Sequence, residues 1–239
     1  MDLVEGAEPQ SAFKRFINTE GEEMKFKYII MAGGEYVKWE TPRHLLEFRG
    51  ERIIDRTIRQ LREQGIEDIS ISSNIPKWFN DCHVPVLYHD NHYVAREYNN
   101  MDGYWCNCFY PLSVPAVYLH GDVVFSDNAI KTIIDQETLS YDFFASGPPF
   151  PANYPKPYEE PFAWKIVDQD RLHMAQRITK DMDKQGRFIR RPIAWEFWAV
   201  LRGQQDVNHI DFNSFVKIND GTCDIDNPNE IPMLERMRI

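Results

Sequence analysis

The sequence predicts an α/β protein whose mostly parallel sheet is covered by helices on both faces. Short apolar runs typical of buried strands alternate with longer segments in which apolar residues recur at helical spacing. Parallel strands need crossover connections, and these place helices on both faces of a sheet. The chain has 239 residues, a length that suits one large domain. We expect residues 1–24 to form an N-terminal extension and residues 25–239 to form that single domain.

The first strand and the first helix of the domain have clear signals. The run KFKYIIMAGG, residues 25–34, is apolar and ends in two glycines, which is typical of a buried strand that enters a tight loop. Four isoleucines and leucines between positions 53 and 61 then follow helical spacing, and Gly65 stands where a helix commonly ends. Residues 44–65 are therefore predicted to contain a helix.

The remaining elements continue the alternation. Residues 91–112 and 128–136 are predicted to be largely helical, and a further helix is expected over residues 191–202. The last segment, residues 215–237, predicts a strand, a turn and a final helix. The apolar runs that predict further strands are residues 66–74, 84–90, 114–126, 143–147, 162–168 and 173–181.

One segment is too rich in proline to be a helix or a central strand. Residues 146–161 hold six prolines in sixteen residues, and proline lacks the backbone N–H that both structures require. We expect a long loop, of the kind that often forms a lid or a substrate wall. Lys165 lies on the strand expected after this loop; it is a candidate for binding a phosphate, and a surface lysine is the equal alternative.

Composition and charge exclude several classes of protein. Hydrophobic residues make up 43% and charged residues 27% of the chain, which excludes long disorder as the main state. Acidic residues outnumber basic ones by 37 to 27, so we do not expect a protein that binds nucleic-acid backbones. No run approaches the roughly 20 apolar residues that span a bilayer, and the first residues do not resemble a signal peptide. We therefore expect a cytoplasmic protein whose four cysteines are reduced thiols.

The loop after the first strand is the first candidate binding site. Ala32, Gly33 and Gly34 let a ligand approach the backbone and offer N–H groups to phosphates or to a base edge, while Lys38 and Arg43 add positive charge. An ordinary strand-to-helix turn with surface cations is the alternative. The loop matches neither GxGxxG nor GxxxxGK[ST], so we expect neither a dehydrogenase nor a P-loop enzyme.

Carboxylates near two strand ends are candidate metal ligands. Asp122 follows the strand in LHGDVVF, so its side chain should emerge at the carboxyl edge of the sheet, where a hard divalent ion can bridge phosphates. Asp224 and Asp226 are two residues apart and point the same way on an extended segment. The alternatives are a turn cap at Asp122 and a helix cap at Asp226.

The order of these motifs resembles a known family. MAGG, TPRHLLEF with RGERIIDRTI, SSN, YNNMDGYW, YLHGDVVFS and DIDNPNE follow one another between Lys25 and Glu235. In this order they resemble the nucleotidyltransferases that activate sugar phosphates and phospho-alcohols. YNNMDG and GDVVFS look most like the cytidylyltransferases that act on phosphocholine and related phosphates for bacterial surface-polysaccharide or capsule precursors. The resemblance implies a Rossmann-like mixed sheet, the glycosyltransferase-A-like nucleotidyltransferase fold.

The resemblance also implies roles for single residues. The backbone of Ala32, Gly33 and Gly34 would hold the nucleotide, and Asn74 and Asn99 would line its base or ribose. Lys38 and Arg43 would neutralise the triphosphate, Asp122 and Asp226 would ligate Mg²⁺, and Lys165 is the candidate for the acceptor phosphate. The sequence departs from the family pattern in its shortened glycine loop and in Arg43, which stands where a lysine is usual. Arginine keeps the charge and can bind a phosphate with two parallel hydrogen bonds.

These expectations define a reaction and its alternatives. A phosphate oxygen of a small phosphorylated acceptor would attack the α-phosphorus of a nucleoside triphosphate, CTP being favoured, and pyrophosphate would leave. Alignment and charge neutralisation suffice, because the attacking phosphate is already an anion. A glycosyltransferase that uses a nucleotide sugar and a non-catalytic nucleotide-binding module are the alternatives. A homodimer is a candidate assembly, and no nucleic-acid or membrane partner is expected.

Overall fold

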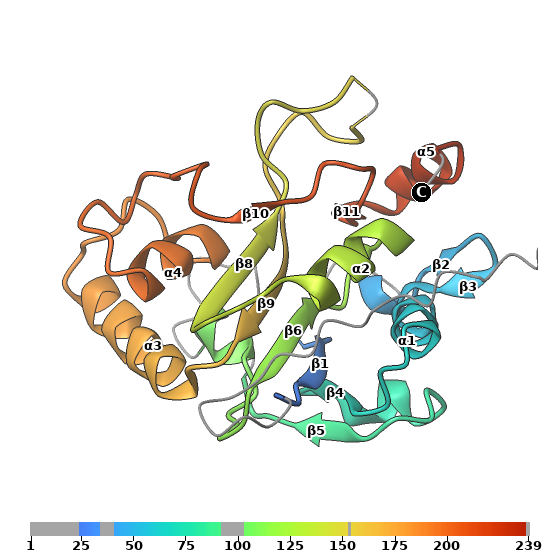
Figure 1. The fold of residues 1–239 in the computed structure, drawn as a ribbon, viewed down its shortest axis with the longest axis horizontal. Coiled ribbons are helices and arrows are strands. Elements are labelled where there is room, and N and C mark those ends of the chain that lie inside the picture. Colours follow the sequence, from blue (N-terminus) through green and yellow to red (C-terminus); the bar gives the residue numbers. More distant parts are fainter. Residues whose placement is uncertain (1–23, 34–40, 92–102, 153, 238–239) are drawn as a thin grey trace, which may run out of the picture.

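The computed structural model describes residues 24–33, 41–91, 103–152 and 154–237. Seven strands form the central sheet: β1 (Lys27–Met31), β4 (Ile69–Ser73), β5 (Val86–Tyr88), β6 (Ala116–His120), β8 (Tyr141–Ala145), β9 (Pro161–Ile166) and β10 (Val216–Lys217). Their order across the sheet is β10-β8-β9-β6-β1-β4-β5 (Figure 1). Only β9 runs antiparallel to its neighbours, β6 and β8, and the other paired strands are parallel. The predicted mixed, mostly parallel sheet is confirmed.

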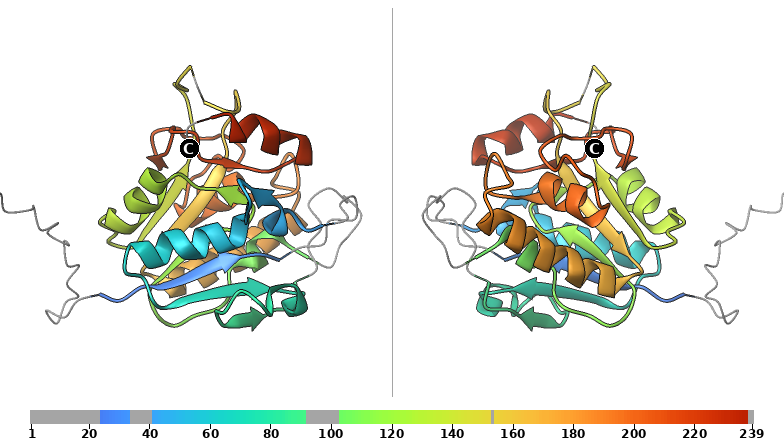
Figure 2. Two further views of the ribbon diagram at one scale, coloured as in Figure 1. Left: turned by 90° about the vertical axis from the view of Figure 1, so that its right-hand side faces the viewer. Right: turned by 90° about the vertical axis from the view of Figure 1, so that its left-hand side faces the viewer.

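Helices cover both faces of the sheet. The helices are α1 (Ile53–Glu63), α2 (Asp127–Asp135), α3 (Gln169–Lys184), α4 (Ala194–Leu201) and α5 (Ile231–Glu235). Successive residues of β1 point to opposite faces. Ile30 packs in one core with Ile58 of α1 and Ile130 of α2, whereas Ile29 packs in a second core with Phe197 of α4. Figure 2 shows α1 in front of the sheet in one view and α3 with α4 in front of it in the other.

Short elements complete the described fold. Two small antiparallel pairs are β2 (Glu47–Phe48) with β3 (Glu51–Arg52) and β7 (Val123–Val124) with β11 (Cys223–Asp224). The 3-10 helices are η1 (Arg43–Leu45), η2 (Pro76–Phe79), η3 (Trp105–Cys108) and η4 (Pro228–Glu230). None of the helices in the described ranges is long and apolar enough to cross a membrane.

The prediction of a strand over residues 173–181 is wrong, because this segment is part of α3. Alternation along a strand would place Met174 and Ile178 on one buried face, but their exposed fractions are 51% and 42%. The buried side chains instead follow helical spacing, with Leu172 and Ala175 facing the core. The Asp168 side chain accepts a hydrogen bond from the backbone N–H of Arg171 and caps this helix.

In the described ranges, three other predicted segments differ in detail from the expectation. The apolar run 114–126 forms β6 and β7 with a turn at Gly121 and Asp122 between them. Of the segment 91–112, predicted to be largely helical, the described residues contain only η3 as a helical element. Residues 43–52 contain η1 and the β2–β3 hairpin, and α1 is the helix predicted within residues 44–65.

Candidate active site

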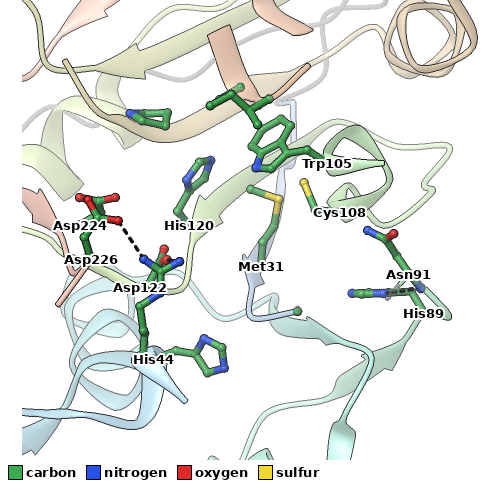
Figure 3. Close-up of a pocket in the computed structure, with 15 residues that line it drawn as sticks. Met31, His44, His89, Asn91, Trp105, Cys108, His120, Asp122, Asp224 and Asp226 are labelled. Atoms are coloured by element: carbon green, nitrogen blue, oxygen red, sulfur yellow. Dashed lines mark hydrogen bonds and ion pairs between the residues drawn. The ribbon is translucent and has the colours of Figure 1, made fainter. Parts of the chain in front are cut away.

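A pocket of about 270 Å³ opens at the carboxyl ends of β1 and β6. Ligands of open α/β sheets commonly bind at this edge. Its polar lining includes Arg43, His44, His120, Asp122 and Asp226. Figure 3 shows Asp122 and Asp226 close together at one end of the pocket and His89 with Asn91 at the other.

The turn after β6 places Asp122 at the pocket. The backbone N–H of Gly121 donates to the carbonyl of Met31, with a nitrogen–oxygen distance of 2.9 Å. A Cβ atom on residue 121 would lie 2.7 Å from that same oxygen, so only glycine lets the turn approach β1 this closely. The next residue therefore emerges beyond the sheet edge, as the sequence predicts.

The pairing of β7 with β11 carries the second carboxylate to the same place. Asp224 lies opposite Val123 in this ladder, and the N–H of Ile225 donates to the backbone carbonyl of Asp122 at 2.9 Å. Asp226 is the next residue along the chain after Ile225, so it lies near Asp122. Two segments that lie far apart in the sequence are thus held together by backbone hydrogen bonds.

Arg43 joins these two carboxylates. Its Nη2 lies 3.0 Å from Oδ2 of Asp122, and its Nη1 lies 3.2 Å from Oδ1 of Asp226. Nη1 also donates to the carbonyl of Ile225 at 2.7 Å. Burial alone would raise the pKa of Asp122, but Arg43, the largest opposing influence, contributes to a pKa below the usual value. Asp122 is therefore ionised at neutral pH.

The donor set fits a hard divalent cation. Asp122 and Asp226 offer carboxylate oxygens, the ligand type that Mg²⁺ prefers, and both line the same pocket. Arg43 shows that a positive charge can be accommodated between them.

Two histidines next to this cluster were missed by the sequence reasoning. Burial lowers the pKa of His44 and of His120 to about 4, so both imidazoles are neutral at pH 7. The Nε1–H of Trp164 donates to Nε2 of His120 at 3.3 Å. The signal in the sequence that could have identified them is position, because His44 follows Arg43 directly and His120 lies two residues before Asp122.

Lys156 was also missed, because it lies in the proline-rich segment. Its side chain is 4% exposed, and its Nζ lies 2.6 Å from both Glu160 and Asp224 and 3.2 Å from Asp226. Burial lowers the pKa of Lys156, but Asp224 and the other neighbouring acids raise it well above its usual value. Burial, together with Asp224, raises the pKa of Glu160.

Gly33 and Asn74 lie side by side. Gly33 lines the pocket, and a Cβ atom there would lie 2.7 Å from Nε2 of His89 and 3.6 Å from Oδ1 of Asn74. Ala32 is buried and its N–H donates to the carbonyl of Ser72 at 2.9 Å. Of the other residues predicted here, Gly34, Lys38 and Asn99 lie outside the described residues.

The structure does not bring Lys165 to the pocket. Its Nζ donates to the carbonyls of Ile134 and Gln136 at 2.8 and 2.7 Å, at the end of α2, and the residue is 1% exposed. Alternation along β9 points this side chain to the face that α2 covers, so Lys165 caps a helix. Lys165 was expected to contact an acceptor phosphate, but in the structure it has this structural role instead.

Part of the chain is similar to a known domain family. Residues 28–97 match the family model of the MobA-like NTP transferase domain. No curated protein matches the chain. Similar solved structures include CTP:phosphocholine cytidylyltransferase from Streptococcus pneumoniae, with 14% identity, a TM-score of 0.47, and coverage of 89% of this chain and 98% of that one. The inositol-1-phosphate CTP transferase from T. maritima has 15% identity, a TM-score of 0.47, and coverage of 89% and 95%.

Proposed function

From the MobA-like NTP transferase domain in residues 28–97, we infer that the protein is a divalent-metal-dependent nucleotidyltransferase. It transfers a nucleoside monophosphate, from CTP by preference, to a small phosphorylated alcohol, amine or sugar and releases pyrophosphate. The observation that carries this proposal is the contact of Arg43 with both Asp122 and Asp226 at the carboxyl edge of the sheet. In the cell, the product would serve as a precursor of surface polysaccharide.

The residues of the pocket fit the requirements of this transfer. Asp122 and Asp226 would hold Mg²⁺, which neutralises charge on the phosphates when bound. Arg43 is the one lysine or arginine among the described residues that line the pocket, so it is the described side chain best placed to bind the triphosphate. Its planar guanidinium suits two oxygens of one phosphate.

The chemical step needs no protein base. An anionic oxygen of the acceptor phosphate forms a bond to the α-phosphorus, and the bond to the bridging oxygen of pyrophosphate breaks. The leaving group takes the electron pair, and Arg43 stabilises the negative charge that develops on it. The neutral state of His44 and His120 is consistent with a reaction in which neither residue acts as a general acid at neutral pH.

The choice of cytosine is supported by the motifs YNNMDG and GDVVFS and by Asn91. The Nδ2 of Asn91 donates to the carbonyl of Tyr104 at 3.3 Å, which fixes the orientation of the amide. Its Oδ1 is buried and has no hydrogen-bond partner in the part of the chain that the structure describes. This oxygen would accept a hydrogen bond from the exocyclic amino group of cytosine, whereas uracil presents an acceptor at that position.

Pyrophosphate release tests the proposal. Protein with Mg²⁺ is incubated with CTP, UTP, ATP or GTP and with phosphocholine, a phospho-amine or a sugar 1-phosphate, with Asp122→Asn as the control. We expect release that depends on one acceptor and is fastest with CTP. Hydrolysis or transfer from a nucleotide sugar without pyrophosphate release would indicate the glycosyltransferase. Thermal stabilisation by nucleotide without turnover of any substrate would indicate the binding module.

A further inference from the structure

Lys156 brings a buried positive charge to the candidate metal site from the proline-rich segment. This segment joins β8 to β9 and lies beside β11 in Figure 1. The Nζ of Lys156 is in contact with the carboxyl groups of four acidic residues. These are Glu160 and Asp224, both at 2.6 Å, Asp226 at 3.2 Å and Glu230 at 3.4 Å. With 4% of its side chain exposed, Lys156 is held among these acids.

The two oxygens of Asp226 are divided between two protein cations. Oδ1 contacts Nη1 of Arg43, and Oδ2 contacts Nζ of Lys156, both at 3.2 Å. Arg43 is in contact with Asp122 and lines the pocket, so it can turn to a triphosphate. Lys156 is buried among the acids of its own loop, β11 and η4, so its charge stays in place.

We propose that Lys156 is the resident counter-ion of Asp226 and lowers the affinity of the nucleotide-free protein for a divalent cation. The inference rests on the proposed role of Asp226 as a metal ligand. A fixed positive charge in contact with a ligand oxygen repels a second cation, and this repulsion is strong where water is scarce. Metal is then held firmly only when the triphosphate adds its own negative charge, so the binding of metal and nucleotide is coupled.

Binding of Mn²⁺ to the nucleotide-free protein tests this role without an activity measurement. Free Mn²⁺ is measured by electron paramagnetic resonance for the wild type, Lys156→Met and Lys156→Arg. We expect Lys156→Met to bind Mn²⁺ roughly tenfold or more tightly, because one repelling charge is removed. Lys156→Arg keeps the charge and should bind within about twofold of the wild type. If Lys156 only held the proline-rich segment in place, its removal would disturb the metal site and Mn²⁺ would bind more weakly, not more tightly.

Lys217→Met is the matched control. Lys217 also ties down the proline-rich segment, since its Nζ donates to the carbonyl of Pro148 at 2.6 Å, but this contact is exposed. Its removal should leave Mn²⁺ affinity unchanged. Should Lys156→Met fail to fold, Lys156→Gln removes the charge while keeping a hydrogen-bond donor, and the same tightening is expected.

The outcomes separate this inference from the proposed function. If folded Lys156→Met or Lys156→Gln binds Mn²⁺ as the wild type does, or more weakly, the proposed role of Lys156 is overturned. It is also overturned if Lys156→Arg binds Mn²⁺ as tightly as Lys156→Met. Asp226→Asn is measured in parallel. If Asp226→Asn binds Mn²⁺ like the wild type, the metal site itself is wrong. If Asp226→Asn loses binding while the neutral Lys156 variants match the wild type, only the counter-ion inference falls.

Discussion

Replacing Arg43 with alanine should reduce both turnover and the free energy of unfolding, because one guanidinium forms ion pairs with two carboxylates. The substitution removes the contacts of 3.0 Å to Asp122 and 3.2 Å to Asp226 and the hydrogen bond to the carbonyl of Ile225. The side chain of Asp122 is 19% exposed, so its charge is left largely unpaired and poorly solvated. Breaking a buried ion pair in this way costs about 3 kcal/mol of folding free energy.

The loss of turnover follows from a separate effect. Removing one donor that stabilises developing charge typically costs roughly 10²-fold or more in rate, so we expect kcat/KM for CTP to fall by about that factor. Arg43→Lys should recover part of the loss, because the charge returns but one ammonium cannot replace the two nitrogens that now contact different carboxylates. Pyrophosphate release at saturating Mg²⁺ gives the rate, and urea denaturation gives the free energy of unfolding.

Arg59→Ala is the control for this experiment. Arg59 also contacts two carboxylates, Glu51 and Glu63, but its side chain is 42% exposed and lies on α1, away from the pocket. Its removal should change the unfolding free energy by about 1 kcal/mol or less and leave turnover unaffected. Normal turnover in Arg43→Ala would refute the reasoning and direct attention to Lys38 as the loop cation.

Three further predictions test other parts of the site and its surroundings. Asp122→Asn and Asp226→Asn should each remove most turnover while the melting temperature shows a folded protein; near-normal turnover of either variant at low Mg²⁺ would exclude that residue as a ligand. CTP with Mg²⁺ should raise the melting temperature more than UTP, ATP or GTP. In Asn91→Ala, the difference between the rises in melting temperature with CTP and with UTP should become smaller. A larger rise with a purine nucleotide would contradict the assignment of cytosine. Burial lowers the pKa of Lys165 to about 8 from 10.5, so the unfolded state holds more protons between these values and stability should rise with pH across them. Relative to Lys165→Met, this rise should amount to about 3 kcal/mol, with turnover at pH 7.5 alike in both proteins; a large loss of turnover would restore Lys165 to the site.

The alternation of strands and helices was predictable because buried strands and half-buried helices have different patterns of apolar residues along the sequence. Mostly apolar runs such as that of β6 are buried on both faces of the sheet, and the spacing in α1 marks one buried stripe. The expected strand over residues 173–181 had little support in the sequence, because apolar and polar residues do not alternate there and Met174 is adjacent to Ala175. The exposure of Met174 and Ile178 depends on how α3 lies on the sheet, which a local pattern does not contain.

The site was predictable where it follows strand ends and unpredictable where it depends on loop closure. Asp122 is placed by the end of β6, and Asp226 by a motif with recognisable spacing, so both could be named from the sequence. Lys156 reaches the acids only through the path of a long proline-rich segment, and no periodicity specifies such a path. The error at Lys165 has the same origin, because the face to which β9 turns this side chain is set by its pairing with β6 and β8.

The charge balance of the pocket favours Lys38 as a second cation for the triphosphate. Arg43 and Lys156 offset Asp122 and Asp226, and the nearby Asp224 and Glu230 make the surroundings more negative. A magnesium-bound triphosphate brings about two further negative charges. Arg43 can turn toward these charges only by giving up carboxylate contacts, and Mg²⁺ can take over those contacts. A second cation on the nucleotide side is then needed to offset the triphosphate, and the loop that carries Lys38 begins at Gly33, within the pocket lining.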